Sequence, residues 1–198
     1  MHYFIEITCL PDEGVPVEFI MGKVMDGLHL AFVDWQHQLG YNPVGVSFPE
    51  YARSEQDGGE ISLGGKIRLF SRDDQAPLQS PKLLQPLQRL ADYVHKRSIS
   101  CLERPNLKFA TFQRVQAKSS RERLLRRQAK RSGQAEEDLR GKYHTFGEER
   151  LTLPFIQLRS HSNSQPFRLF VSKQAAQASE AWQFGSYGLS STVAVPDF

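Results

Sequence analysis

The chain has 198 residues, of which 39% are hydrophobic, and a formal net charge of +3. That size suits one elaborated domain or two small ones. No run approaches the ~18 apolar residues of a membrane span, and residues 1–7 read as a strand and not as a signal peptide. We therefore expect a protein of the cytoplasm with no membrane partner. The two cysteines, Cys9 and Cys101, are too far apart for a CxxC motif, and we expect both to be buried thiols in a reducing compartment.

Strand and helix patterns alternate in the first half of the chain. Alternating apolar and polar residues indicate strands with one buried face, and an apolar stripe at helical spacing indicates a long helix that proline can begin. In chain order the predicted elements are a strand Tyr3–Cys9, a helix Pro16–Leu39, strands Val44–Phe48 and Lys66–Ser71, a helix Leu78–Val94 interrupted at Pro86, and a strand Arg97–Glu103. This βαββαβ order predicts a ferredoxin-like domain over residues 1–106.

The second half, residues 107–198, has a different character. It begins with a basic segment, in which we predict a helix at about residues 119–132. A strand pair, Leu153–Arg159 and Phe167–Val171, follows with a polar linker between its members. The sequence therefore predicts an α+β protein whose C-terminal α/β domain carries an arginine-rich helix.

Positive charge is concentrated between Gln113 and Arg131. This segment holds eight of the twenty-five Lys and Arg residues and a single acid, Glu122, whereas the rest of the chain has seventeen basic and twenty-one acidic residues. Phosphates respond to the local field and not to the total charge, so this distribution favours a polyanion site.

The register of the basic segment narrows the choice of polyanion. Ser119 and Glu122 fit a capping box at a helix start. At about 100° per residue, four cations fall on one arc: Arg123, Arg126, Arg127 and Lys130. Solvated helices usually interleave acids at i+4, and membrane-surface helices carry large apolar residues on the opposite face. Both features are nearly missing, so nucleic acid is the favoured partner.

The sequence lacks a Walker loop, a GxSxG elbow, an HExxH motif and clustered metal ligands, so we expect neither a metal nor another cofactor. RNA permits metal-free cleavage because its 2′-hydroxyl can attack the adjacent phosphate once a base removes the proton. Histidine suits that base role near neutral pH. His29, at the edge of the apolar stripe, and His161, in the polar linker, are equally good candidates from pattern alone.

Five motifs occur together in the order of one known family. They are Gly45–Pro49 (GVSFP), Arg114–Ser119 (RVQAKS), Leu158–Ser162 (LRSHS), Phe167–Phe170 (FRLF) and Ser186–Ser190 (SYGLS). With these motifs the chain resembles the CRISPR repeat-processing endoribonucleases of the type I-F (Csy) system, in the RAMP superfamily, from its first strand to its last residues.

This resemblance implies an enzyme that binds the repeat stem-loop of a CRISPR precursor RNA and cuts at the 3′ base of the stem without a metal. Its products would carry a 2′,3′-cyclic or 3′-phosphate and a 5′-hydroxyl, and it would stay on its product within the type I-F surveillance complex. His29 would deprotonate the 2′-hydroxyl, Ser160 would hold that hydroxyl, and Tyr187 would orient the site. RNA contacts would come from Arg114, Gln116, Lys118, Arg123, Arg126, Arg127, Lys130, Arg131, Ser162 and Phe167. Among these, Arg114 and Gln116 would read base edges and Phe167 would stack on the terminal base pair.

Two other functions remain open at this point. A non-catalytic subunit that only caps an RNA hairpin would share the basic helix, and a DNA-binding regulator would show comparable affinity for duplex DNA. His161 likewise remains the rival general base.

Overall fold

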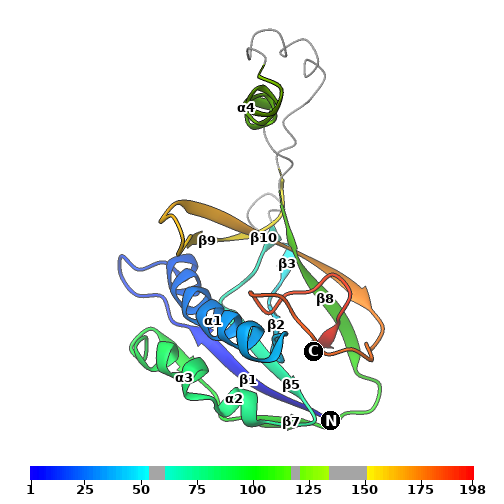
Figure 1. Cartoon of the computed structure of the whole chain (residues 1–198). Helices are drawn as coiled ribbons and strands as arrows, with labels where there is room; N and C mark the ends of the chain where they lie inside the picture. Colours follow the sequence, from blue (N-terminus) through cyan, green and yellow to red (C-terminus); the bar gives the residue numbers. More distant parts are fainter. Residues whose placement is uncertain (54–60, 117–120, 134–150) are drawn as a thin grey trace. The chain divides into compact units, whose positions relative to one another are not determined.

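The computed structural model describes residues 1–53, 61–116, 121–133 and 151–198, with the backbone alone described at residues 53 and 121–126. Contacts divide the chain into two compact units. The first comprises Met1–Val115 together with Leu153–Phe198, and the second comprises Gln116–Thr152 (Figure 1). This division differs from the predicted boundary at residue 106, because the strands on either side of the basic segment pair with each other.

The first unit contains a sheet in the order β2-β5-β1-β6. Its strands are β1 (His2–Cys9), β2 (Gly45–Ser47), β5 (Lys66–Arg72), β6 (Val94–Lys96) and β7 (Ser100–Leu102), the last of which also pairs with β1. All of these pairings are antiparallel. The central strands β1 and β5 were predicted within one residue at each end, because their apolar residues alternate as a half-buried strand requires.

Helix α1 (Val17–Leu39) follows β1 and lies over this sheet (Figure 1). The predicted apolar stripe comprises nine residues between Val17 and Trp35; eight of them, from Ile20 onward, are buried, and Val17 packs against the same core. The helix ends at Gly40, whose φ of 80° is the left-handed conformation that glycine adopts at helix C-termini.

The predicted helix Leu78–Val94 was wrong in extent. The structure has two short helices instead, α2 (Ala76–Gln79) and α3 (Pro81–Gln88), and the chain then turns into β6. The interruption falls before Pro81, which begins α3, whereas Pro86 lies inside α3. Proline is well accommodated at the first helical position, so Pro81 marks a start. A small hairpin, β3 (Ala52–Arg53) with β4 (Ile61–Ser62), completes this half.

A second antiparallel sheet has the order β11-β8-β10-β9. Its strands are β8 (Lys108–Val115), β9 (Phe155–Arg159), β10 (Pro166–Ala176) and β11 (Val195–Asp197). The predicted strand pair is confirmed as β9 and β10, which pair from Arg159 with Pro166 to Phe155 with Phe170. Strands β8 and β11 were not predicted. Buried residues of both sheets and of α1 form one hydrophobic core, and the structure is therefore mixed α and β as predicted.

Glycine allows α1 to lie very close to strand β9. A Cβ atom built on Gly22 would lie 2.8 Å from the backbone oxygen of Gln157, closer than carbon and oxygen tolerate. Since the linker after β9 contains Ser160 and His161, this contact sets how close that linker comes to His29, seven residues further along α1.

The second unit contains helix α4, which runs from Arg121 to Ser132 within the predicted range of 119–132. Its last turn carries Lys130 and Arg131, and the Ser132 hydroxyl donates to the Gln128 carbonyl at 2.9 Å. Ser119, the predicted cap, lies outside the described residues.

Two further expectations concern the whole chain. In the described part of the chain, no helix is both long and apolar enough to cross a membrane. Cys9 is buried as expected, and burial raises the pKa of its thiol to about 12. The expectation for Cys101 was wrong: it is exposed, because it lies on β7 where the side chain faces outward.

Replacement of Gly22 by alanine tests the close contact between α1 and β9. The added methyl group must displace a backbone carbonyl, and we expect Gly22→Ala to lower the free energy of unfolding by about 1–3 kcal/mol in urea titrations. Gln38→Ala, at an exposed position of the same helix, should change it by less than about 0.5 kcal/mol. A gain of about 1 kcal/mol in Gly22→Ala, as helix propensity alone predicts, would contradict the contact.

Candidate functional site

His29 lies on the third turn from the end of α1 and is half-buried. Its Nδ1 atom lies 2.7 Å from the backbone oxygen of Ser186. A carbonyl oxygen can only accept, so Nδ1 must carry the proton of this hydrogen bond. In a neutral imidazole the other nitrogen, Nε2, then holds the free lone pair. This hydrogen bond therefore leaves Nε2 of His29 in the form that a general base requires.

The segment that carries Ser186 is held by a buried asparagine. Asn42 has no exposed surface, and its side-chain amide donates to the backbone oxygens of Val44 and Gly185, each at 3.0 Å. Its backbone oxygen accepts from Phe184, also at 3.0 Å. Val46 of β2 donates to the Gly188 oxygen at 2.8 Å. Gly188 has a φ of 70° and a Cβ there would lie 2.3 Å from Val46, so only glycine fits this turn. The Ser186 carbonyl is thus fixed on both sides.

Tyr187 stacks on the ring of His29. The two ring centroids are 4.3 Å apart and the planes differ by 7°. Burial raises the pKa of the Tyr187 phenol; the Asp26 carboxylate raises it further, whereas the Arg114 guanidinium opposes the shift. At neutral pH the phenol is therefore protonated and can donate a hydrogen bond.

Arg114 and Phe167 extend this arrangement. The Arg114 guanidinium carbon lies 5.6 Å from the centroid of Tyr187 and 5.7 Å from that of Phe167. The Phe167 and Tyr187 rings meet edge to face at 6.4 Å. Arg114 is the last residue but one of β8 and Phe167 is the second residue of β10, and these two strands pair in the second sheet. A guanidinium that covers aromatic faces keeps its N–H edge available for a ligand.

The linker between β9 and β10 brings His161 to the same place. The Ser160 amide donates to the Gln165 oxygen at 2.9 Å, and the Ser164 amide donates to the Ser160 oxygen at 2.8 Å. The Ser160 and Ser162 hydroxyls are 3.0 Å apart. The His161 ring lies nearly parallel to His29, with centroids 6.0 Å apart, and its Nε2 atom is 3.8 Å from a carboxylate oxygen of Asp26. We call the group His29, Tyr187, Arg114, Phe167 and His161 the His29 cluster.

Of the predicted site residues, the structure brings His29, Tyr187, Arg114 and Phe167 together. Ser160 and Ser162 lie in the linker beside His161, and their hydroxyl oxygens are within hydrogen-bond distance of each other. The remaining predicted residues belong to the second unit. Gln116, Arg127, Lys130 and Arg131 are exposed, Arg123 and Arg126 lie on α4 where only the backbone is described, and Lys118 lies outside the described residues.

Asp26 and Asn42 were not identified from the sequence. Asp26 precedes His29 by three positions on α1, which places both on neighbouring parts of the helix surface. That spacing was the one available signal, and an acid on a helix border is usually solvated. Asn42 stands between Tyr41 and Pro43, where asparagine normally indicates a turn.

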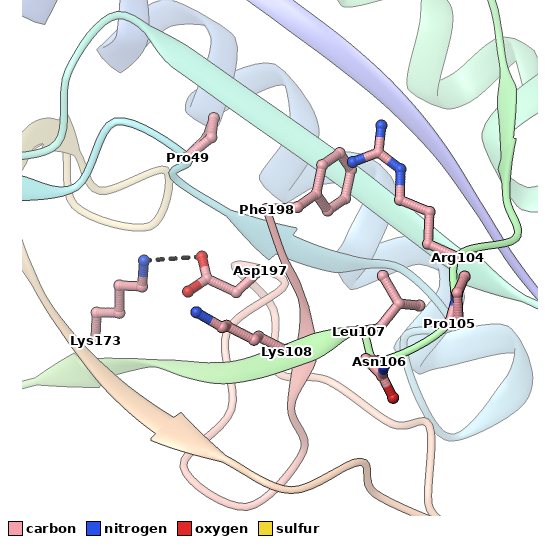
Figure 2. A pocket seen from close by; sticks show the side chains of 9 residues that line it. All are labelled: Pro49, Arg104, Pro105, Asn106, Leu107, Lys108, Lys173, Asp197 and Phe198. Carbon is pink, nitrogen blue, oxygen red and sulfur yellow. Dashed lines mark ion pairs between the residues drawn. The ribbon is translucent and has the colours of Figure 1, made fainter.

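A pocket of about 500 Å³ lies elsewhere in the first unit (Figure 2). Its lining includes Arg104, Lys108, Phe198 and the ion pair between Lys173 and Asp197, whose charged atoms are 2.8 Å apart. None of the predicted site residues lines it. The His29 cluster therefore remains the candidate site, because it is where the predicted residues gather.

The shifted pKa of Tyr187 has a measurable consequence. The pKa of the Tyr187 phenol is higher in the folded state than the unfolded value of about 10. The phenol therefore contributes fully to the free energy of unfolding below pH 10, and this contribution is lost as the pH rises through the folded-state pKa. In urea titrations, we expect the free energy of unfolding to fall less between pH 9 and pH 11 in Tyr187→Phe than in the wild type. Tyr41→Phe, at an exposed position, should follow the wild type. Equal losses in Tyr187→Phe and the wild type would show that the phenol is not buried in this way.

Comparison with known proteins shows the family of this chain. Residues 4–198 match the family described as CRISPR-associated protein (Cas_Csy4). The chain is 34% identical over 201 residues to the CRISPR-associated endonuclease Cas6/Csy4 of Pseudomonas aeruginosa (strain UCBPP-PA14), with both chains covered completely. It is 30% identical over 200 residues to the protein of the same description from Escherichia coli (strain UTI89 / UPEC), again over the full length of both. With a match over nearly its whole length, the chain belongs to the Cas_Csy4 family of CRISPR-associated proteins.

Proposed function

We propose that this protein is the endoribonuclease that processes CRISPR precursor RNA, cutting at the 3′ base of the repeat stem-loop without a metal. The observation that carries the proposal is the His29 cluster, in which an imidazole with a free lone pair lies beside an aromatic platform and a guanidinium. These side chains come from α1, β8, β10 and the C-terminal segment. The endonuclease description of the full-length relatives supports the same activity.

The proposed reaction uses the 2′-hydroxyl of the substrate as the nucleophile. Nε2 of His29 takes its proton, and the hydrogen bond from Nδ1 to Ser186 holds the ring in this tautomer. Ser160 holds the 2′-hydroxyl, and the protonated Tyr187 keeps the His29 ring in place by stacking. The products carry a 2′,3′-cyclic phosphate, which can open to a 3′-phosphate, and a 5′-hydroxyl.

Phe167 explains why cleavage would occur at the end of a stem. An exposed terminal base pair can stack on an aromatic ring. The Phe167 ring contacts that of Tyr187, which in turn stacks on His29. The phosphodiester that follows the stacked pair would then lie beside His29. Arg114, which covers both aromatic rings, and Gln116 would read base edges near the stem end.

The second unit would supply the remaining affinity. Exposed Arg127, Lys130 and Arg131 of α4, with Lys118, Arg123 and Arg126, would contact phosphates of the stem, and Ser162 would contact RNA near the site. In this proposal residues 107–198 are the RNA-binding part and residues 1–106 are a ferredoxin-like domain, which the antiparallel strand order β2-β5-β1-β6 supports. The protein would act in the cytoplasm, where its RNA is transcribed, and would stay bound to its product with the other type I-F complex subunits.

Removal of the proposed base separates catalysis from binding. We expect His29→Ala to reduce single-turnover cleavage of a repeat hairpin by at least about 100-fold in the presence of EDTA, with hairpin affinity nearly unchanged. His37→Ala is the matched control, because His37 is an exposed histidine at the end of the same helix.

Three outcomes of this experiment would count against the proposal. Wild-type protein that binds the hairpin without cleaving it would indicate a non-catalytic RNA-binding subunit. Cleavage that EDTA abolishes would exclude the metal-free reaction. Competition by duplex DNA at equal affinity would indicate a DNA-binding regulator.

Helix α4 provides a test of the proposed phosphate contacts. Each lost contact should weaken hairpin binding and reduce the slope of log K against log[salt] by about 1. We expect Arg127→Ala and Lys130→Ala each to show weaker binding and a smaller salt slope. Their cleavage rate at saturating protein should equal that of the wild type. Lys96→Ala, at an exposed lysine of β6, should leave the slope as in the wild type. Unchanged salt slopes in both α4 variants would remove α4 from the binding surface.

A further inference from the structure

His161 has a position that the proposed roles of His29, Ser160 and Tyr187 leave unexplained. Its ring lies nearly parallel to that of His29, with an interplanar angle of 25° and centroids 6.0 Å apart. The hydrogen-bonded turn that begins at Ser160 fixes its backbone. Two imidazoles that lie this close, one with a defined free lone pair, form a pair suited to acid–base chemistry on a single phosphodiester.

Asp26 distinguishes the two imidazoles. Its carboxylate faces Nε2 of His161 at 3.8 Å, where the side chains are 28% and 48% exposed respectively. His29 instead donates from Nδ1 to a neutral carbonyl. A carboxylate interacts favourably with an imidazolium, whereas a carbonyl partner selects one neutral tautomer. The two imidazoles therefore have different partners, a carboxylate at Nε2 of His161 and a backbone carbonyl at Nδ1 of His29.

We infer that His161 is the general acid of the cleavage reaction, that its Nδ1–H protonates the departing 5′-oxygen, and that Asp26 positions it. This inference rests on the proposed function, because it assumes cleavage by 2′-hydroxyl attack with His29 as the base. It adds a general acid and one positioning residue to that reaction.

The protons and bonds of this step balance without any other reactant. The 2′-hydroxyl proton moves to Nε2 of His29, and the 2′-oxygen forms a bond to phosphorus. The bond between phosphorus and the 5′-oxygen breaks, and that oxygen takes the Nδ1 proton of His161. The result is a 2′,3′-cyclic phosphate, a 5′-hydroxyl, a protonated His29 and a neutral His161, which exchange with water restores.

The spacing of the two imidazoles allows one to act as base and the other as acid on the same phosphodiester. Attacking and leaving oxygens lie roughly in line on opposite sides of the phosphorus during phosphoryl transfer. The centres of the two imidazole rings are 6.0 Å apart. A phosphodiester at the edges of both rings can therefore place one oxygen within hydrogen-bond distance of each imidazole, at about 2.6–3.2 Å. The Asp26 carboxylate faces Nε2 of His161 at 3.8 Å, so Nδ1 is the nitrogen left for the substrate.

Sulfur in place of the 5′-bridging oxygen tests the acid role directly. A thiolate leaves without protonation, because a thiol has a pKa near 8.5 and an alcohol a far higher one. We expect His161→Gln to cleave the ordinary hairpin at least about 100-fold more slowly than the wild type. On the 5′-thio hairpin it should react within about threefold of the wild type. His29→Ala, by contrast, should be slow on both substrates.

Asp26 is tested with the same two substrates. Asp26→Asn should slow cleavage of the ordinary hairpin while it leaves the 5′-thio hairpin nearly unaffected, and Asp26→Glu should restore part of the lost rate. Asp34→Asn is the matched control, since Asp34 lies on the same helix and forms an exposed ion pair with Lys82 at 2.6 Å. His37→Gln is the matched control for His161→Gln. Thermal unfolding and hairpin affinity identify any variant that fails to fold, and only the ratio of rates on the two substrates decides the assignment.

Each further outcome is decisive. If His161→Gln is as fast as the wild type on the ordinary hairpin, or equally slow on both substrates, the acid assignment is overturned while the endonuclease function stands. If the wild type cleaves neither hairpin, the proposed function fails first. If Asp26→Asn and Asp34→Asn behave alike, Asp26 has no positioning role.

Discussion

The hydrogen bond from His29 Nδ1 to the Ser186 carbonyl is the interaction on which the rest of the site depends. It joins residues 157 positions apart and determines which nitrogen of the imidazole keeps its lone pair. Much of the surrounding structure serves to fix that carbonyl. Buried Asn42 holds Gly185, and β2 holds Gly188, so the carbonyl approaches His29 from a rigid segment and not from a free chain end. Tyr187 then stacks on the ring that its neighbour has oriented.

Close packing of α1 on β9 positions the other side of the site. Gly22 lets α1 lie against β9, and the linker that follows β9 carries Ser160 and His161 towards His29. The second sheet adds Arg114 and Phe167 through the pairing of β8 with β10. Four separate segments therefore converge because two sheets and one helix share a single hydrophobic core. The second unit contains the basic helix α4, to which we assign the proposed phosphate contacts.

Sequence patterns predicted those parts of the structure whose periodicity is local. The stripe of α1, the alternation of β1 and the β9–β10 pair could all be recognised, since each is set by neighbours within a few residues. Strand β8 was missed because Arg114 and Val115 belong both to its end and to the basic segment, whose charge dominated the interpretation. His29 and His161 could not be separated from sequence, because the difference between them lies in partners distant in the chain, Ser186 and Asp26. Those partners give the two histidines different chemistry within one cluster.

The tautomer of His29 is the most direct measure of this account. Nitrogen-15 NMR of the imidazole side chains, with His29 assigned by comparison with His29→Gln, distinguishes a protonated Nδ1 from a protonated Nε2. At a pH where His29 is neutral, we expect Nδ1 to carry the proton and Nε2 to be unprotonated. A spectrum in which Nε2 of His29 is protonated and Nδ1 is bare would contradict it, because the proposed base would then have no lone pair facing the RNA.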